Sequence, residues 1–411
     1  MVADRKKLIK NSLKSFKKNF KMKKIYLLIL VFTWTLHSCK TKEYSGKPVG
    51  KTIDFEDFLH KKESKTLAEI YFEHGNFINT KQFPPVVNAA DVLEHINDWL
   101  IIDIRKPDAY EAGHINGAYN VPKDKVIDFL KNKQKAAAYD KVIIVCYSGQ
   151  MASYVTGITR YAGFDNTYVM LFGMAAWNSQ FSDILKKGFG DRYQEMIVKD
   201  IDKDEQLLVK DEQENIGKNK IDLSKLPTLP KRLPSLLIAE RADKLLKQNR
   251  KNFLIKADEY FPEIKKDLNA YYSIYYMNKP KYYVAHIKGS VQFTPRKDLS
   301  LDGKLTEIPV DKPVMIYCKT GHTSGNATAY LDMLGYKAHS LMFGAQSFMN
   351  SLWKQKQWMP DVDALINDFP VVQGKKRTNN KVVAAATQTK SKAPVKPIVK
   401  HKKKEVTGGC G

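Results

Sequence analysis

Two stretches of this sequence decide its fold: VIIVCYSGQM at residues 142–151 and VMIYCKTGHT at residues 314–323. Each begins with four mostly apolar residues, passes through a cysteine into a short turn that contains glycine, and leads into a helical pattern. Near-continuous apolar runs followed by helices are typical of parallel strands that are covered on both faces. We therefore predict a strand, a tight loop and a helix around Cys146 and again around Cys318.

The two stretches belong to an internal repeat. The separation from His114 to Cys146 is 32 residues, and the separation from His286 to Cys318 is also 32. Glycines lie 17 and 27 residues after the first cysteine, and 17 and 26 residues after the second. Separations that agree within one residue indicate a duplicated domain.

Short apolar runs alternate with helical patterns through both copies of the repeat. This alternation predicts an α/β protein with two domains, each a parallel sheet of about five strands flanked by helices. In the first copy we expect strands at 99–104, 118–121, 142–147 and 167–172, and helices at 123–135, 150–162 and 174–186. In the second copy we expect strands at 252–255, 314–318 and 338–343, and helices at 236–249, 322–334 and 344–355.

The segments outside the two copies differ from them in composition. We divide the chain into an N-terminal extension with a signal segment at 1–39, a lead-in at 40–84 that is helical over 51–84, a first domain at 85–195, a charged linker at 196–230, a second domain at 231–368, and a disordered lysine-rich tail at 369–411 that ends in GGCG.

The basic charge is concentrated at the two ends of the chain. The formal net charge is +24, of which residues 1–24 carry +9 and residues 374–411 carry +10, so the rest of the chain carries +5. A nucleic-acid-binding domain would place its Lys and Arg side chains on a folded face. We therefore expect no nucleic-acid partner.

An apolar run, IYLLILVFTWTL at 25–36, follows three lysines near the N-terminus. Its twelve residues are too few to span a bilayer but suit the core of a signal peptide. The run ends in Leu36-His37-Ser38-Cys39, which resembles the cleavage site of bacterial lipoproteins. The resemblance implies a lipid on Cys39 and an exported protein that is anchored to the cell envelope, on the periplasm-facing side of a membrane. An uncleaved signal anchor is the alternative.

Cys146 and Cys318 are candidate nucleophiles. A cysteine between a buried strand and a helix faces backbone N–H groups and the helix N-terminus, which stabilise an anion. A thiol held in this way should have a lowered pKa, and the thiolate is the reactive form. One such cysteine is more often an inert core residue, but its recurrence in the repeat favours catalysis. The four cysteines lack the spacing of a zinc site or a disulfide framework, so we expect no metal.

Both copies resemble the rhodanese family. Asp103-Ile-Arg105 and the segment Gly113-His-Ile-Asn-Gly-Ala118 are similar to the family's DVR and GHIPGA motifs, and Cys146-Tyr-Ser-Gly149 is similar to its active-site loop. The resemblance implies a five-stranded parallel α/β domain. Its cysteine would take a sulfane sulfur from a small donor such as thiosulfate, hold it as a persulfide, and pass it to a thiol or cyanide without a cofactor.

The resemblance also implies roles for individual residues. Asp103 and Arg105 would support the loop structurally, and His114 and His286 would occupy structural places rather than act as bases. Cys146 and Cys318 would be catalytic, and the sulfur would be surrounded by Tyr147, Ser148, Gly149, Gln150 and Met151 in the first copy and by Lys319, Thr320, Gly321, His322 and Thr323 in the second. Lys319 and His322 could add positive potential that favours an anionic donor, or could be solvated polar residues of a loop.

The second copy departs from the family pattern. Its Asp-x-Arg triplet aligns with Lys256-Ala257-Asp258, and about 19 extra residues then precede His286. This extra segment is rich in tyrosine, at 271, 272, 275, 276, 282 and 283. We expect it to pack against its own domain, and the alternatives are a cover over the site or a surface for a partner.

Two other functions compete with sulfur transfer. Related phosphatases need an Arg six residues after the cysteine to hold the phosphate oxygens, and this chain has Ala152 and Ser324 there. A non-catalytic binding or scaffold module would be expected to lose a cysteine in at least one copy, and both copies keep theirs. The C-terminal Cys410 is open to two interpretations: an acceptor on a flexible arm, or an incidental residue in a tail that binds an envelope surface by charge.

Overall fold

The computed structural model describes residues 67–71, 77–132, 136–200, 234–248 and 253–375, and all of these belong to one packed unit. The predicted signal segment with Cys39, most of the predicted linker, and the tail with Cys410 lie outside the described residues. The predicted lead-in is helical at 67–71 and forms a 3₁₀ turn at Phe77–Asn79. None of the described helices is both long and apolar enough to cross a membrane.

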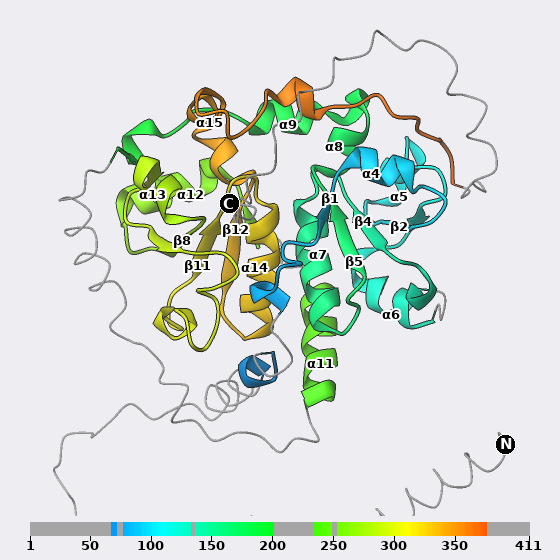
Figure 1. Ribbon diagram of the computed structural model, residues 1–411, viewed down its shortest axis with the longest axis horizontal. Helices are drawn as coiled ribbons and strands as arrows, with labels where there is room; N and C mark the ends of the chain where they lie inside the picture. The colour runs from blue at the N-terminus through cyan, green and yellow to red at the C-terminus, as the bar shows by residue number, and fades with distance from the viewer. Residues whose placement is uncertain (1–66, 72–76, 133–135, 201–233, 249–252, 376–411) are drawn as a thin grey trace, which may run out of the picture. The chain divides into compact units, whose positions relative to one another are not determined.

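The first copy of the repeat is a five-stranded parallel sheet with the order β1-β5-β4-β2-β3 (Figure 1). Its middle strands, β2 and β4, are buried along their whole length because both faces are covered by helices. The strands are β1 (Val86–Val87), β2 (Leu100–Asp103), β3 (Tyr119–Asn120), β4 (Val142–Val145) and β5 (Thr167–Met170). The helices are α4 (Ala89–Glu94), α5 (Pro107–Glu111), α6 (Val126–Asn132), α7 (Gln150–Tyr161), α8 (Gly173–Trp177) and α9 (Asp183–Gly188).

The second copy repeats this topology with the order β7-β12-β11-β8-β10, which confirms the two predicted α/β domains. Each strand has its counterpart in the first sheet, and all four neighbouring pairs are parallel. The strands are β7 (Leu254–Ile255), β8 (Tyr272–Tyr276), β10 (Val291–Phe293), β11 (Val314–Tyr317) and β12 (Ala338–Leu341). The helices are α11 (Pro234–Lys247), α12 (Ala257–Lys266), α13 (Lys279–Val284), α14 (His322–Met333) and α15 (Asn350–Gln355).

The predicted alignment of the second Asp-x-Arg triplet is wrong. Residues 256–258 begin α12, and β8, which lies in the predicted extra segment, is the counterpart of β2. Val314 of β11 pairs with Tyr272, just as Val142 of β4 pairs with Leu100, so Tyr275 and Met277 stand where the first copy has its aspartate and arginine. The tyrosine-rich segment thus contains a core strand, with Tyr282 and Tyr283 on the helix that follows it at Lys279–Val284, and it does pack within its own domain as expected.

Two predicted helices are interrupted. The segment 174–186 contains α8, a 3₁₀ turn at Ser179–Phe181 and α9, and the segment 344–355 contains a 3₁₀ turn at Gly344–Ser347 and α15. Asn178 is extended between α8 and the 3₁₀ turn, and its side chain accepts a hydrogen bond from the Gln180 N–H. A capping asparagine of this kind stops one helix and starts the next.

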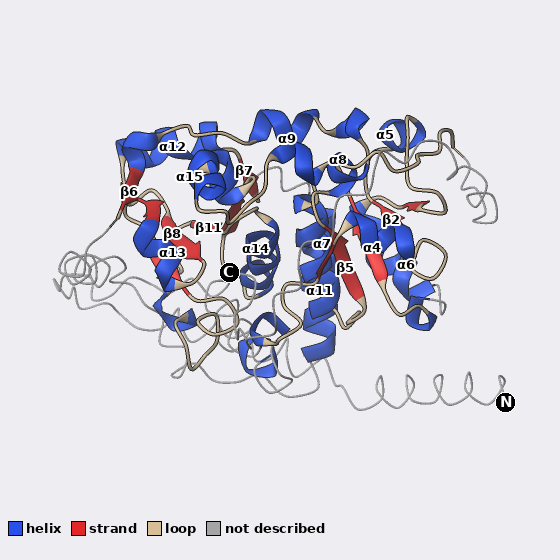
Figure 2. Cartoon of the chain, turned by 45° about the horizontal axis from the view of Figure 1, so that its top comes forward, coloured by secondary structure: helices blue, strands red, loops and turns tan. Residues whose placement is uncertain are grey.

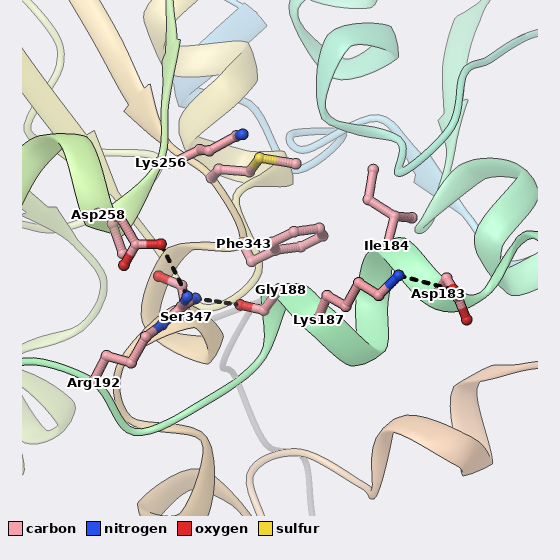
Figure 3. A pocket seen from close by; sticks show the side chains of 11 residues that line it. Asp183, Ile184, Lys187, Gly188, Arg192, Lys256, Asp258, Phe343 and Ser347 are labelled. Carbon is pink, nitrogen blue, oxygen red and sulfur yellow. Dashed lines mark hydrogen bonds and ion pairs between the residues drawn. The ribbon is translucent and has the colours of Figure 1, made fainter.

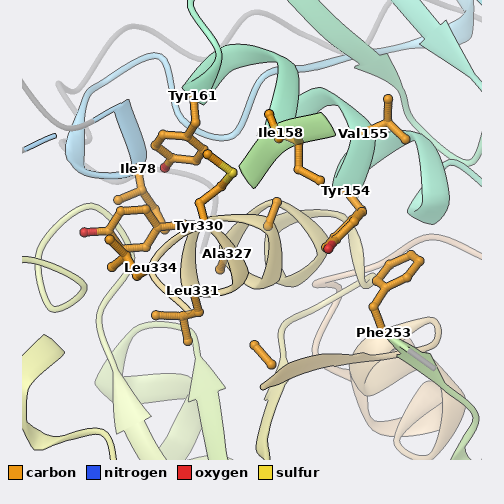
Figure 4. Close-up of a cluster of buried hydrophobic side chains, with 14 of the residues drawn as sticks. Ile78, Tyr154, Val155, Ile158, Tyr161, Phe253, Ala327, Tyr330, Leu331 and Leu334 are labelled. Carbon is orange, nitrogen blue, oxygen red and sulfur yellow. The ribbon is translucent and has the colours of Figure 1, made fainter. Parts of the chain in front are cut away.

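Helices α7 and α14 pack against each other, with one sheet on either side of the pair (Figures 1 and 2). Equivalent positions meet: a Cβ on Gly157 would lie 2.7 Å from that of Ala329, and a Cβ on Gly325 would lie 3.1 Å from that of Ser153. Contacts between equivalent residues indicate a pseudo-twofold axis between the helices. One hydrophobic cluster runs across this interface, and Figure 4 shows part of it, including Ile78, Val155, Ile158, Tyr161, Ala327, Tyr330, Leu331 and Leu334.

The two copies also exchange the segments that follow them. After the first copy, β6 (Ile197–Lys199) pairs antiparallel with β9 (Ala285–Ile287), which places Val198 opposite His286. After the second copy, Val372 forms the equivalent antiparallel bridge with His114. The predicted linker therefore begins with an ordered strand, and the predicted disordered tail is wrong for residues 369–372, which are hydrogen-bonded to the first copy.

Candidate active site

The Cys146 sulfur lies between the end of β4 and the start of α7, as predicted. Cys146 Sγ accepts a hydrogen bond from the Ala152 N–H at 3.3 Å, and the backbone N–H groups of Ser148 and Gly149 also point at it. Gly149 has a φ of 79°, a left-handed conformation that lets the loop curl around the sulfur. The loop therefore directs several N–H groups at one atom, and Cys146 itself is only 4% exposed.

The Cys318 sulfur has the same setting in the second copy. Cys318 Sγ accepts hydrogen bonds from the N–H groups of Gly321 and Ser324, both at 3.3 Å. The Ser324 hydroxyl lies 3.5 Å from the sulfur and 2.8 Å from the Ser340 hydroxyl. Cys318 is 1% exposed, so the sulfur of the second copy is the more enclosed of the two.

The prediction of a lowered thiol pKa is wrong for Cys146. Burial raises the pKa of Cys146, and the N–H groups of Ala152, Ser148 and Gly149 lower it by less. The nearby carboxylate of Asp103 also raises the pKa. The N–H groups that the sequence predicts are present, but the loss of water around the buried sulfur outweighs them.

The turn after β5 holds the backbone of the nucleophile, a contact that sequence reasoning missed. The Met174 N–H donates to the Cys146 carbonyl at 2.9 Å, and the Ala175 N–H donates to the Tyr147 carbonyl at 2.9 Å. A Cβ on Gly173 would collide with the Cys146 carbonyl oxygen, so only glycine fits there. The second copy repeats the contact from Ala345 to Cys318 at 2.8 Å. The sequence signal for this contact was the glycine at nearly the same distance after each cysteine, Gly173 and Gly344.

Gln150 and His322, which occupy equivalent positions in the two loops, each reach into the loop of the other copy. His322 Nε2 accepts a hydrogen bond from the Phe172 N–H at 3.0 Å, and Gln150 Nε2 donates to the Thr320 carbonyl at 3.0 Å. Burial lowers the pKa of His322 to about 4, so this imidazole is neutral at pH 7. The interpretation of His322 as a source of positive potential beside Cys318 is therefore wrong.

The other predicted loop residues differ in exposure. Tyr147, directly after the nucleophile, is 43% exposed and is the most open residue of the first loop. Ser148 and Thr320 are buried, whereas Met151, Lys319 and Thr323 are half-buried.

Asp103 and Arg105 form a buried ion pair near the first loop. The Arg105 guanidinium donates to the Asp103 carboxylate and to the Gly113 carbonyl, both at 2.7 Å. Its central carbon lies 5.6 Å from the centre of the Tyr147 ring. The pair thus braces the loop, in agreement with its predicted structural role, and Tyr275 and Met277 replace it in the second copy.

His114 and His286 occupy equivalent structural positions. Each ring stacks on a tyrosine, Tyr110 or Tyr282, with ring centres 3.6 and 3.7 Å apart. Each Nδ1 lies 2.8 Å from the carbonyl oxygen of that tyrosine and must donate to it. Burial lowers the pKa of both histidines, to about 4 for His286. Neutral rings fixed in this way support the structural interpretation rather than a role as bases.

A separate cavity of about 500 Å³ lies between α9 and the start of α12 (Figure 3). Phe343 forms part of its wall, and the Lys256 side chain points into it. Arg192 at its edge is paired with Asp258 at 3.1 Å. Neither cysteine lines this cavity. Within the described residues there is also no cluster of three or more His, Cys, Asp or Glu side chains that could hold a metal ion.

Comparison with known proteins points to one family. Residues 88–180 and 276–351 match the model of the rhodanese-like domain. The chain is 31% identical over 104 residues to the thiosulfate sulfurtransferase GlpE of Pseudoalteromonas translucida, an alignment that covers 25% of this chain and 95% of that protein. It is 34% identical over 82 residues to GlpE of Pseudomonas entomophila, which covers 20% of this chain and 72% of that protein.

A solved structure of a thiosulfate sulfurtransferase from Pseudomonas aeruginosa also aligns with the chain. The alignment has 14% sequence identity and a TM-score of 0.21, and it covers 77% of this chain and 70% of that one.

Proposed function

The chain belongs to the rhodanese-like family, and we propose that it is a sulfurtransferase that carries sulfane sulfur as a persulfide on Cys146, with Cys318 as a second carrier. The donor is a small sulfur compound such as thiosulfate, and the acceptor is a thiol or another nucleophile. The proposal needs no cofactor, because the cysteine itself carries the transferred atom.

One observation carries this proposal: each cysteine sulfur is the common target of several backbone N–H groups at a helix N-terminus. Such a cradle stabilises negative charge on sulfur. Both the attacking thiolate and the persulfide that it forms bear that charge. The same cradle at equivalent positions in two copies supports a chemical role for it.

The chemistry proceeds in two displacements. The Cys146 thiolate attacks the outer sulfur of thiosulfate, a new S–S bond forms, and the donor's S–S bond breaks so that sulfite leaves with the electron pair. An acceptor thiolate then attacks the outer sulfur of the persulfide, and the Cys146 thiolate is released. Because burial raises the pKa of Cys146, we expect loading to accelerate as the pH rises above neutrality.

The test is intact-protein mass spectrometry of the full chain, reduced and then incubated with thiosulfate. We expect wild type to gain one sulfur atom, Cys146→Ser to lose most of that gain, and the double variant with Cys318→Ser to lose all of it. Loading that depends only on Cys318 would show that the second copy, and not the first, holds the nucleophile. A wild-type chain that accepts no sulfur from several donors would refute the transferase and favour a binding module.

We also propose that the chain is exported and held at a membrane by a lipid on Cys39. The apolar run at 25–36 and the sequence Leu36-His37-Ser38-Cys39 support this proposal. Incorporation of radiolabelled palmitate in a bacterial host tests it. The label should appear in wild type and disappear in Cys39→Ala, and equal labelling of the two chains would refute the lipid anchor.

A further inference from the structure

We propose that His322, in the second copy, is a positioning residue for the nucleophile of the first copy, so that sulfur loading at Cys146 depends on a side chain of the other domain. This inference rests on the proposed sulfurtransferase function, and it assigns His322 to the Cys146 site rather than to the Cys318 site beside it in the sequence. Four observations carry it.

The first is the bond from His322 to the turn that holds Cys146. His322 Nε2 accepts the Phe172 N–H at 3.0 Å. Phe172 has a φ of 58°, a left-handed conformation that a bulky residue adopts only when its surroundings enforce it. Two residues later the Met174 N–H donates to the Cys146 carbonyl at 2.9 Å. The imidazole is thus hydrogen-bonded to the same turn whose Met174 N–H holds the peptide of the nucleophile.

The second is the contact of the His322 ring with the nucleophile's loop. A Cβ on Gly149 would collide with the imidazole, so the ring fills the space where that residue has no side chain. Gly149 supplies one of the N–H groups that point at the Cys146 sulfur. Loss of the ring would therefore free the loop residue that helps form the cradle.

The third is that the ring is held on both sides. Its Nδ1 lies 3.1 Å from the Thr320 hydroxyl, and since Nε2 accepts, Nδ1 carries the proton and donates. The Thr320 carbonyl accepts a hydrogen bond from Gln150 of the first copy. Two of these hydrogen bonds cross the interface: Phe172 to His322, and Gln150 to Thr320.

The fourth is an asymmetry between the two crossing residues. Gln150 is the counterpart of His322, yet its Oε1 is buried without a hydrogen-bond partner among the residues that the structure describes. In the second copy Gln150 therefore makes no bond of the kind that His322 makes to Phe172. We therefore expect Cys146 to depend on a side chain of the second copy more strongly than Cys318 depends on one of the first.

The experiment compares His322→Ala, His322→Gln and Tyr154→Phe in the full chain. Glutamine stands at the equivalent position of the first copy and offers a carbonyl oxygen to the Phe172 N–H. Tyr154 donates to Asp332 at 2.7 Å across the same interface, and its ring stacks on Phe253, which belongs to neither cysteine loop. Tyr154→Phe therefore removes one buried interdomain hydrogen bond and leaves both cysteine loops intact.

Two quantities are measured at each cysteine by peptide mass spectrometry: the rate of persulfide formation, and the rate of alkylation by iodoacetamide between pH 6 and pH 10. We expect His322→Ala to slow loading of Cys146 by about tenfold or more and to shift the pH profile of its alkylation, while Cys318 changes less. His322→Gln should recover much of the rate, and Tyr154→Phe should retain it.

Two results would overturn the inference: a His322→Ala chain whose Cys146 loads and alkylates like wild type, or a Tyr154→Phe chain that is impaired equally. The second result would mean that any weakening of the interface acts on Cys146. Alkylation reports on the position of Cys146 even in a chain that accepts no sulfur. Failure of the proposed function and failure of the positioning role are therefore separate outcomes.

Discussion

The imidazole of His322 accepts the backbone N–H of Phe172 at 3.0 Å, and this hydrogen bond joins the cysteine loop of one copy of the repeat to the corresponding turn of the other. Both groups are buried, so the bond is not exchanged with water and its loss would leave an unpaired donor. The two copies therefore share one region around their helix N-termini.

Acid should weaken this shared region through His322. Burial lowers its pKa to about 4 in the folded chain, against an ordinary value near 6.5. Between these pH values the unfolded chain binds a proton that the folded chain does not. The contribution of neutral His322 to the free energy of unfolding is therefore fully present well above pH 6.5 and is lost as the pH drops toward 4. The ceiling of this loss is about 3 kcal/mol.

Urea denaturation at pH 7.5 and pH 5 measures this loss. His286 has a similarly low pKa and adds its own pH dependence, so the informative quantity is the difference between wild type and His322→Gln. We expect the variant to lose less stability than wild type on going to pH 5. Identical losses in the two chains would show that His322 does not keep its low pKa.

A methyl group on Gly157 should separate the two copies. Its Cβ would lie 2.7 Å from that of Ala329, far inside van der Waals contact. We expect Gly157→Ala to reduce the free energy of unfolding by about 1–3 kcal/mol, despite the better helix propensity of alanine. Adding Ala329→Gly should recover part of the loss, which a double-mutant cycle in urea measures. Additive effects would mean that these positions do not touch.

Gly173 should be less tolerant of substitution than a glycine with similar backbone strain. Gly163 and Gly173 both have positive φ, but a Cβ on Gly163 meets open space, whereas one on Gly173 meets the Cys146 carbonyl. We expect Gly163→Ala to cost about 1–2 kcal/mol and to leave Cys146 alkylation unchanged. Gly173→Ala should cost more and should alter that alkylation. Equal behaviour of the two variants would exclude a specific role for the turn.

The apolar strands and cysteine loops could be predicted from the sequence because their signals are local. The runs at 142–145 and 314–317 are apolar, and each is followed by a glycine that permits a positive φ. Strand β8 was missed because four of the five residues in YSIYY carry a hydroxyl group, so the run does not read as apolar although all five residues are buried. The Tyr260 hydroxyl lies 2.7 Å from that of Ser273, a pairing between segments that no local pattern reveals.

The contact of His322 with the first copy could not be predicted from the sequence, for a different reason. A sequence lists the neighbours of His322 along the chain, and these surround Cys318. Its neighbours in space are set by the pairing of α7 with α14, which depends on small residues such as Gly157 and Gly325 on their facing surfaces. The same limit applies to Val372, whose bridge to His114 joins residues far apart in the sequence.

Removal of Arg105 should expose the cost of an unpaired buried charge. The Asp103 and Arg105 side chains are almost completely buried and 2.7 Å apart. We expect Arg105→Met, the residue found at the equivalent place in the second copy, to cost about 3–5 kcal/mol because it leaves the buried carboxylate without its cationic partner and with the backbone N–H of residue 105. Asp103→Asn in the same chain should recover part of that cost. Thermal and urea unfolding measure both, and no recovery would show that Arg105 acts through packing alone.

The segment that follows the second copy should be needed for the stability of the first. Phe369 packs against the Trp177 ring with centres 5.2 Å apart, and Trp177 Nε1 donates to the Pro370 carbonyl at 2.9 Å. The two bridge bonds between His114 and Val372 measure 2.9 and 3.0 Å. A chain that ends at residue 365 loses all of these contacts and uncovers the indole, whereas a chain that ends at residue 375 keeps them.

We expect the chain that ends at 375 to unfold like the full chain, and the chain that ends at 365 to lose more than about 2 kcal/mol. The tryptophan fluorescence of the shorter chain should also shift to the red as Trp177 meets water. Phe369→Ala in the full chain separates the ring contact from the loss of backbone bonds, and it should cause a smaller loss. If the two truncated chains were equally stable, the bridge at Val372 would contribute nothing, and the first copy would be complete without the segment that follows the second.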